Sequence, residues 1–206
     1  MPARLLRDAA PAPKTVRRVP GAKSGTMTTP DAVEDLVAAL RELGGTPPPV
    51  RIAAMLRDMR VDERSLAPYM HWKPQRYTRN LIAREEAFEL IAICWDDGVV
   101  SAIHDHADSN CTFVVAQGAM RCENFRVRWP DGERDRNCRL EPAGQRILRP
   151  GQLDVASGHI SVHRVGAVEG RSVTLHVYAK PIEACLHFDE DGNARLTASR
   201  YDTLPA

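Results

Sequence analysis

The hydrophobic pattern of this chain changes near residue 76, from helical spacing to short runs typical of β-strands. Before this point one apolar stripe follows the 3.6-residue period of a helix. Its members are Val33, Leu36, Val37, Leu40 and Leu43. Thr29 can cap this helix and Pro30 suits its first turn, whereas Gly44-Gly45 would end it. A second, shorter helix is predicted over residues 50–59.

From Arg76 onward, short runs rich in β-branched and apolar residues alternate with turn signals. The runs are YTRNLIAR, FELIAICW, TFVVAQG, AMRCENFRVRW, QRILRP, ISVHRVGAV and SVTLHVYAK. The turn signals between them are Asp97-Gly98, Pro130-Asp131-Gly132, Ala143-Gly144, Pro150-Gly151 and Glu169-Gly170. Many short strands at this spacing favour a sandwich or a barrel. We therefore predict a mainly β protein, in which N-terminal α-helices pack on a β-barrel.

Residues 1–28 differ from the rest of the chain. They contain four prolines and a single acidic residue, with several Arg and Lys and no apolar periodicity. This composition predicts a disordered N-terminal tail. An Arg-rich transit peptide is the alternative, although the prolines disfavour an amphipathic helix. Residues 29–206 are expected to form a single domain with a helical N-terminal part, since 206 residues suit one domain and a tail.

The charge balance and the cysteines narrow the class of protein. Lys plus Arg number 28 and Asp plus Glu number 27, so the net charge of +1 gives no reason to expect a nucleic-acid partner. No apolar run reaches the length of a membrane helix and no secretory signal is visible, so no membrane association is expected. The five cysteines are odd in number and lack CxxC spacing, which favours reduced thiols in the cytoplasm. We also expect a monomer.

His104 and His106 are the first candidates for chemistry. In a strand, residues i and i+2 point to the same face, so these two imidazoles would project side by side as a pair of metal ligands. An HxH pair alone is a weak signal, because polar pairs on strands are often merely solvated. Cys111 follows five residues later. Its thiol could be a third ligand, or simply a small buried apolar residue.

The spacing around this pair resembles the first signature motif of the cupin superfamily. The motif positions are Gly98, His104, His106, Cys111 and Gly118. The segment from Gly144 to His163 resembles the second motif more loosely, and that motif supplies one more histidine. The resemblance implies a cupin (jelly-roll-like) β-barrel in which His104, His106 and His163 converge on one metal ion.

Five blocks together resemble the cysteine dioxygenase family of cupin thiol dioxygenases. They are RYTRNL at 76–81, CWDDG at 94–98, HDHADSNC at 104–111, HRV at 163–165 and LHVYAKP at 175–181, all in the order of the family. The likeness extends from about Arg76 to Cys185, over half of the chain. It departs from the family at Asn110, where histidine is frequent, but this position lies outside the metal set.

The resemblance implies a metal centre with a covalent crosslink beside it. His104, His106 and His163 would bind Fe(2+). Three neutral imidazoles leave the charge of such a site at +2, which favours an anionic substrate ligand such as a thiolate. Cys111 and Tyr178 would form the cysteine–tyrosine thioether of the family, so the thiol would lie near the metal to join a phenol rather than to bind iron.

The resemblance also implies a substrate site. Arg79 would hold the substrate carboxylate with two parallel donors, and Tyr77 would help there. His176 would hydrogen-bond the hydroxyl of Tyr178, and Tyr178, Arg79 and His176 would be the catalytic residues. Taken singly, each of these residues could instead have a purely structural role. Tyr77 and Arg79 could face solvent, and His176 and Tyr178 could be ordinary barrel filling.

The expected function is oxidation of L-cysteine by O2 to cysteine sulfinic acid, with a small-molecule thiol and O2 as the partners. A dioxygenase for 3-mercaptopropionate or another thiol acid is one alternative, although such relatives tend to carry an amide in place of Arg79. A non-enzymatic cupin module with a structural metal is the alternative of another class. His159 is expected to be a loop residue, and His71 and His187 are expected at the surface.

Overall fold

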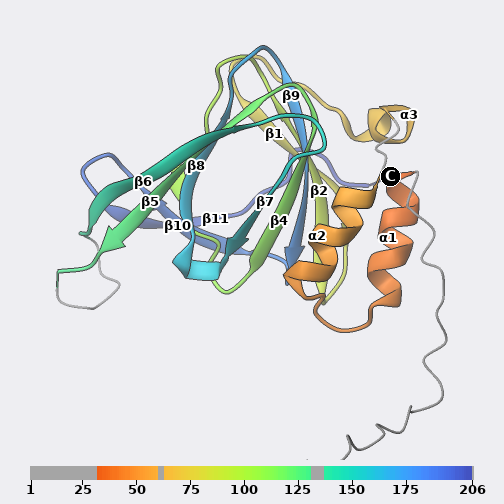
Figure 1. The fold of residues 1–206 in the computed structure, drawn as a ribbon, viewed down its shortest axis with the longest axis horizontal. Coiled ribbons are helices and arrows are strands. Elements are labelled where there is room, and N and C mark those ends of the chain that lie inside the picture. Colours follow the sequence, from red (N-terminus) through yellow and green to blue (C-terminus); the bar gives the residue numbers. More distant parts are fainter. Residues whose placement is uncertain (1–31, 60–62, 131–136, 206) are drawn as a thin grey trace, which may run out of the picture.

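The computed structural model describes residues 32–59, 63–130 and 137–205 (Figure 1). The predicted tail lies outside these residues, as do Thr29, Pro30 and the Asp131-Gly132 part of one predicted turn. The helices are α1 (Val33–Glu42), α2 (Pro49–Asp58), α3 (Glu63–Leu66) and the 3-10 turns η1 (Ala67–Tyr69) and η2 (Gly158–Ile160). The first two correspond to the helices predicted from the hydrophobic pattern, and α3 with η1 was not predicted.

The start of α1 corrects the sequence-based prediction. Its N-cap is Ala32, not Thr29, and no side chain of its own caps it. The N–H of Val33 is instead 3.3 Å from Oγ of Ser65, a residue of α3. A tertiary contact therefore supplies the cap, which no local pattern could show. The end is as predicted, since Gly44 and Gly45 both have positive φ, of 60° and 59°.

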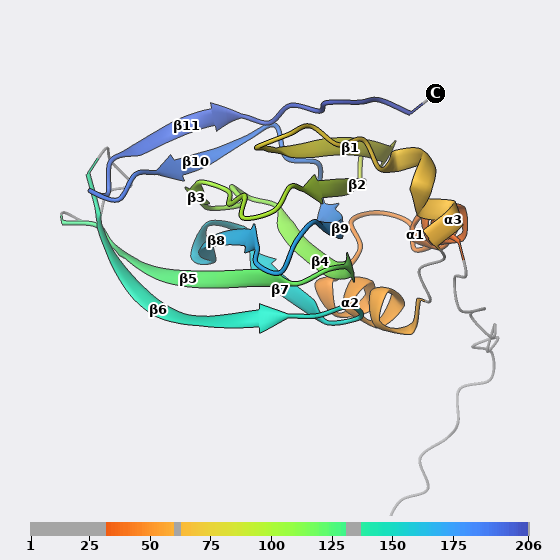
Figure 2. The same ribbon diagram turned by 90° about the horizontal axis from the view of Figure 1, so that it is seen from above.

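In the described parts of the chain, eleven strands form two antiparallel sheets. The strands are β1 (Tyr77–Arg84), β2 (Phe88–Trp95), β3 (Ile103–His104), β4 (Asn110–Gln117), β5 (Met120–Arg128), β6 (Arg139–Leu148), β7 (Leu153–Ser157), β8 (Val162–Ala167), β9 (Ser172–Ala179), β10 (Ala184–Phe188) and β11 (Ala194–Ala198). One sheet has the order β1-β2-β9-β4-β7 and the other the order β11-β10-β3-β8-β5-β6 (Figure 2). The predicted mainly β architecture is confirmed.

The strands β2 and β9 of the five-stranded sheet are buried on both faces. On β2, Leu90, Ala92 and Cys94 pack with α1 and α2 on the outer face. The alternate residues Ile91 and Ile93 face the interior, together with apolar side chains of the second sheet. Because every residue of β2 and β9 is buried, both runs read as continuous apolar stretches with a few polar residues. Those polar residues are therefore forced into the barrel or against its helices.

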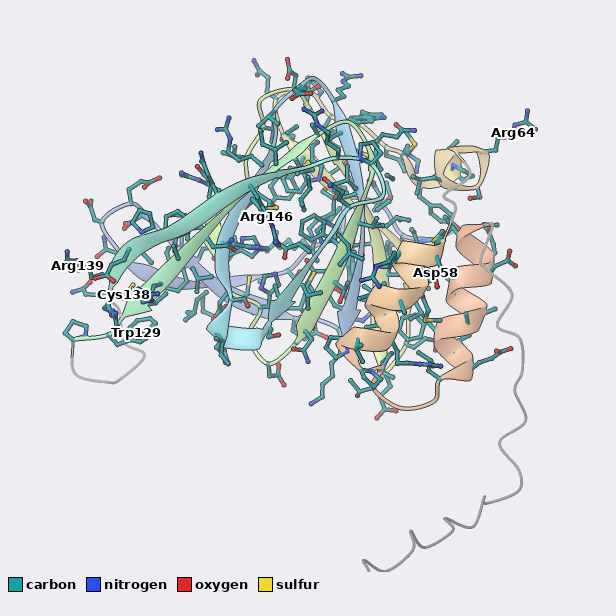
Figure 3. All side chains as sticks on the ribbon, in the orientation of Figure 1. Asp58, Arg64, Trp129, Cys138, Arg139 and Arg146 are labelled. Carbon is teal, nitrogen blue, oxygen red and sulfur yellow. The ribbon has the colours of Figure 1, made fainter. Side chains whose placement is uncertain are left out.

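The β5–β6 hairpin extends away from the helices and corrects a second prediction. Ala143-Gly144 was expected to be a turn, yet β6 continues through it and pairs with β5 on both sides. The register shifts between Asn124 and Phe125, opposite this position, and Gly144 has a φ of 121°. The glycine thus serves a β-bulge rather than a turn. Trp129 and Cys138 lie at the far end of the hairpin (Figure 3).

Gly118, in the turn between β4 and β5, packs closely against the backbone of Arg171 and Ser172 at the start of β9. It has a φ of 77°, and an added Cβ would lie 2.9 Å from Cα of Ser172, with the carbonyl oxygen of Arg171 closer still. Gly170 has a φ of 90° and open space around it. We expect Gly170→Ala to cost about 1 kcal/mol of unfolding free energy through φ alone. Gly118→Ala should cost about 1–3 kcal/mol more, from overpacking, in urea unfolding. Equal costs for the two variants would contradict this account of the turn.

Candidate functional site

Three histidines meet where β3 and β8 pair. His104 ends β3 and lies opposite His163 of β8, and His106 follows two residues later. The three ring centroids are 4.8–5.1 Å apart. One nitrogen from each ring lies within 4.8 Å of the others, so the three could hold one metal ion. The structure thus brings together all three histidines of the predicted metal set.

Backbone carbonyls orient two of these rings. Nδ1 of His104 is 2.9 Å from the carbonyl oxygen of Ala102, and Nδ1 of His106 is 3.4 Å from that of Ser161. A carbonyl only accepts, so each Nδ1 carries the hydrogen and each Nε2 keeps a free lone pair. Burial lowers the pKa of His104 to about 4 and that of His106 to about 3. Both rings are therefore neutral near pH 7, which is the form that binds a metal.

Asp105, between the two histidines, fixes the loop that carries them. Its side chain is 2% exposed and accepts hydrogen bonds from the N–H groups of Leu186 (2.9 Å) and Ala107 (3.3 Å). Its other oxygen is 2.7 Å from Nδ1 of His159. His159 was expected to be a plain loop residue. It does lie between two strands, in η2, but it contacts the buried carboxylate next to the histidine cluster.

The predicted crosslink pair lies on neighbouring strands of the interior wall. Cys111 on β4 is directly opposite Tyr178 on β9, and both are buried. Burial raises the pKa of the Cys111 thiol and of the Tyr178 phenol, so both are protonated near pH 7. A protonated thiol is a poor metal ligand, and Cys111 is not in the cluster that could hold an ion.

His176 differs from its predicted contact. It was expected to hydrogen-bond the hydroxyl of Tyr178, but its Nε2 is 2.8 Å from Oγ1 of Thr174 and its Nδ1 is 3.6 Å from Sγ of Cys111. The reason is geometric. His176 and Tyr178 are two apart on one strand face, and their rings are within 15° of parallel with centroids 6.1 Å apart. One ring nitrogen therefore faces Thr174 on the same strand and the other faces Cys111 on β4, so neither is directed at the phenol oxygen.

Arg79 of β1 reaches into the same interior. Its Nη1 donates to the hydroxyl of Tyr178 at 3.5 Å, and its guanidinium carbon lies 5.6 Å from the centre of that ring. Its Nε and Nη2 are buried and have no hydrogen-bond partner among the described residues. Nη2 lies 3.6 Å from Oε1 of Glu89, which is close for charges but too far for a good hydrogen bond. Two buried cationic donors therefore remain available to an anion.

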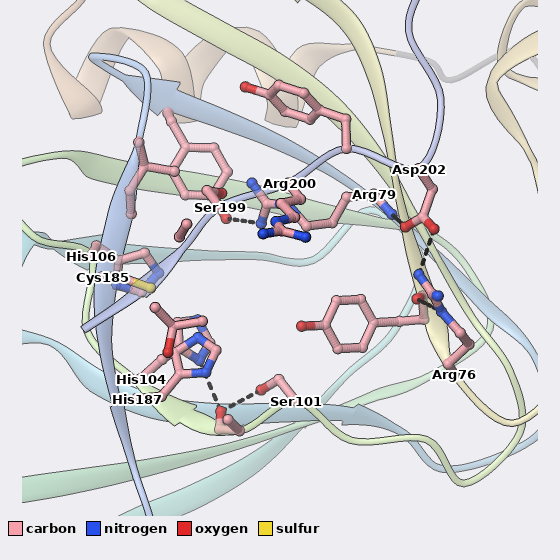
Figure 4. Close-up of a pocket in the computed structure, with 17 residues that line it drawn as sticks. Arg76, Arg79, Ser101, His104, His106, Cys185, His187, Ser199, Arg200 and Asp202 are labelled. Atoms are coloured by element: carbon pink, nitrogen blue, oxygen red, sulfur yellow. Dashed lines mark hydrogen bonds and ion pairs between the residues drawn. The ribbon is translucent and has the colours of Figure 1, made fainter. Parts of the chain in front are cut away.

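A cavity of about 520 Å³ opens beside these groups (Figure 4). Its walls include Tyr77, Arg79, His104, His106 and Tyr178, and a smaller inner chamber of about 30 Å³ shares all five. His163 and His176 line the inner chamber. The ring of Tyr77 packs against Trp95 at an angle of 37°, with centroids 4.8 Å apart, so its phenol is held at the cavity wall. The cation, the histidine cluster and the phenols thus border one space.

Sequence reasoning missed two residues of this site. His187 was expected at the surface, but it pairs with His104 across β10 and β3, and its ring is 6.1 Å from that of His104 at the cavity wall. Glu89 lies behind Arg79 and is fully buried. The sequence did hold a signal for Glu89, because it is the one charged residue in the apolar run FELIAICW. His71 is exposed, as predicted.

Comparison with known proteins decides the family. The model of the family "Cysteine dioxygenase type I" matches residues 25–191. The chain belongs to this cysteine dioxygenase family. The family predicted from the sequence is therefore confirmed, and with it the cupin fold expected for the mainly β barrel. No helix in the described parts of the chain is long and apolar enough to cross a membrane.

Cysteine dioxygenases from other organisms match this chain over most of its length. Cysteine dioxygenase type 1 of Rattus norvegicus is 32% identical over 166 residues, covering 78% of this chain and 80% of the relative. The protein of the same name from Danio rerio is 29% identical, covering 78% and 81%. Among solved structures, KdgF from Halomonas sp. is 23% identical with a TM-score of 0.41, covering 54% of this chain and 84% of that one. A likeness this distant adds nothing to the assignment.

Proposed function

We propose that this chain is an Fe(II)-dependent thiol dioxygenase that oxidises L-cysteine with O2 to cysteine sulfinic acid. Family membership supports a dioxygenase. The observation that carries the choice of substrate is Arg79. A buried guanidinium with two unpaired N–H groups borders the same chamber as three neutral histidines. A small molecule with a carboxylate at one end and a metal-binding thiol at the other satisfies both at once.

The histidine cluster suits Fe(II) by the chemistry of its donors. Three neutral imidazole nitrogens can hold the ion. The carboxylate of Asp105, which lies between His104 and His106 in the sequence, is already hydrogen-bonded to Leu186, Ala107 and His159. The charge of a bound Fe(II) would stay at +2, so a thiolate is a favourable ligand. When bound, Fe(II) would supply open positions for thiol, amine and O2 and the redox chemistry that joins both oxygen atoms to sulfur. The sulfur itself supplies the electrons, so no external reductant is needed.

The chain's own residues would orient the substrate. Arg79 donates from Nε and Nη2 to the two oxygens of the carboxylate, because a guanidinium presents these donors in a flat fork. The phenol of Tyr178 stays protonated, and because its oxygen accepts from Arg79, its own proton is free to be donated into the chamber. Tyr77 offers a second phenol at the same wall. This fixed placement removes much of the entropic cost of bringing the reacting groups together.

The metal role is tested first by substitution of His163. We expect His163→Ala to remain folded, to lose bound iron and to lose O2 uptake with L-cysteine, because two imidazoles hold the ion too weakly. Metal analysis and O2 consumption are measured under reducing, iron-replete conditions. His71→Ala is the control, since His71 is exposed and outside the cavity. A fully active, iron-replete His163→Ala would refute the assignment. Wild type that binds iron but oxidises none of a panel of thiols would be a non-enzymatic module.

Substrate choice is tested through Arg79. Wild type should have a higher kcat/KM for L-cysteine than for 3-mercaptopropionate, which lacks the amine that also binds iron. Arg79→Gln should lower kcat/KM for L-cysteine by an amount that corresponds to about 2–5 kcal/mol of lost transition-state stabilisation. This is the usual effect of removing one partner of a buried charge pair. Cysteamine has no carboxylate and should be affected far less. A preference of wild type for 3-mercaptopropionate, or undiminished cysteine turnover in Arg79→Gln, would sink the L-cysteine assignment.

We also propose that Cys111 and Tyr178 become joined as a thioether: the S–H bond and one ring C–H bond break, a C–S bond forms, and O2 takes up the two hydrogens as hydrogen peroxide, for which a bound iron would supply the redox chemistry. Their directly opposed positions on β4 and β9 support this, since neighbouring strands keep such pairs close. A tryptic digest after turnover should contain the two peptides linked, at a mass two hydrogens below their sum. Cys111→Ser should lack the link and keep part of the activity. A Cys111 that stays fully alkylatable after many turnovers is the contrary result.

A further inference from the structure

We infer that the C-terminal segment, residues 199–203, belongs to the substrate-binding machinery, with Tyr201 and Asp202 as positioning residues for Arg79. The inference rests on the proposed role of Arg79 as the carboxylate anchor. The family match ends at residue 191, so this segment lies beyond the matched part of the chain. We call residues 199–203 the C-terminal strap.

The strap holds the main chain of Arg79 from the open side of its sheet. β1 is the edge strand, and Figure 2 shows the C-terminal segment running beside it. The N–H of Asp202 donates to the carbonyl of Arg79 at 2.7 Å, and the N–H of Arg79 donates to Oδ2 of Asp202 at 3.0 Å. The N–H of Leu81 donates to the carbonyl of Thr203 at 3.1 Å. Asp202 therefore clasps both backbone polar groups of Arg79.

The carboxylate of Asp202 is itself held by cations. Nζ of Lys73 lies 2.9 Å from its Oδ1, and Arg76 contacts the same oxygen. In Figure 4 Asp202 lies between Arg76 and Arg79. This leaves Oδ2 for the backbone of Arg79. The carboxylate is thus fixed on one side and orients Arg79 on the other.

The strap also influences the side chain of Arg79, through Tyr201 and Glu89. The hydroxyl of Tyr201 donates to Oε2 of Glu89, and Nη1 of Arg84 donates to the same hydroxyl at 2.6 Å. The other oxygen of Glu89 lies 3.6 Å from Nη2 of Arg79. At that distance the carboxylate attracts the guanidinium without using its N–H groups, which remain unpaired. Tyr201 therefore sets the position of the counter-charge that aims Arg79.

The unpaired donors of this network belong to Arg79. Glu89, which is fully buried, lies 3.6 Å from Nη2 of Arg79 and 3.5 Å from Nη1 of Arg84, and Arg84 also pairs with the exposed Glu183. The buried Nε and Nη2 of Arg79 keep no hydrogen-bond partner among the described residues, and the carboxylate of a substrate would satisfy them. Residues of the strap also line the 520 Å³ cavity opposite the histidines (Figure 4). The strap is therefore one wall of the site as well as the support of its cation.

The test compares two substrates in the same variants. Tyr201→Phe and Asp202→Asn should each raise KM for L-cysteine about tenfold, the effect of one lost charge-assisted hydrogen bond, with a smaller change in kcat. Neither should change KM for cysteamine. Glu169→Gln is the matched control, because Glu169 pairs with Arg149 in an exposed ion pair away from the cavity. Equal losses with both substrates would mean that the strap only stabilises the fold, and unchanged KM for L-cysteine would overturn the inference outright.

Anaerobic calorimetry separates this inference from the proposed function. Iron-loaded wild type should bind L-cysteine more tightly than cysteamine, and Tyr201→Phe and Asp202→Asn should each lose most of that difference. If this pattern holds while wild type oxidises neither thiol, the proposed activity fails and the positioning role stands. If wild type shows no preference for the thiol with a carboxylate, the strap does not position a carboxylate anchor and the inference is wrong.

Discussion

The two-faced burial of β9 is the constraint on which the site depends. Every residue of this strand is buried, so its side chains must divide between two apolar environments by simple alternation. Val173, Leu175 and Val177 go to the helices, and His176 and Tyr178 are thereby sent into the barrel. No residue of the described helices lines the cavity. Without the helices, however, the outer residues of β9 would be exposed to water. Their burial helps to fix the strand register that directs the inner residues into the cavity. The packing of β9 thus determines which of its side chains reach the cavity.

Desolvation then determines the state of the groups that arrive inside. Burial keeps the imidazoles neutral and the thiol and phenol protonated, so Arg79 brings a permanent positive charge among uncharged groups of the inner chamber. A permanent charge in such a place needs a counter-charge. Glu89 supplies it at a distance that leaves donors free. The site is therefore prepared for an anion without being filled by its own carboxylate.

The sequence predicted those parts of the molecule that depend on local period and on recognisable blocks. The stripe from Val33 to Leu43, the seven strands that match the predicted runs, and the meeting of His104, His106 and His163 follow from such patterns, whereas β3, β7, β10 and β11 were not predicted. What failed depended on contacts between distant segments. The cap of α1 comes from Ser65, and His187 enters the wall because β10 pairs with β3. His176 contacts Thr174 and Cys111 instead of the Tyr178 hydroxyl because its ring packs flat on Phe113 of the neighbouring strand, a packing detail that residue spacing does not encode.

The strap along β1 has a consequence for the life of the protein outside its reaction. An unpaired edge strand is a template on which a second chain can add its own strand. Residues 199–203 bond both backbone polar groups of Arg79 and the N–H of Leu81, which β1 would otherwise present at its open edge. A molecule in which this segment is cleaved or detached would therefore carry an open edge next to an incomplete cavity wall. Such molecules would tend to self-associate through β1, and the bound segment protects against this.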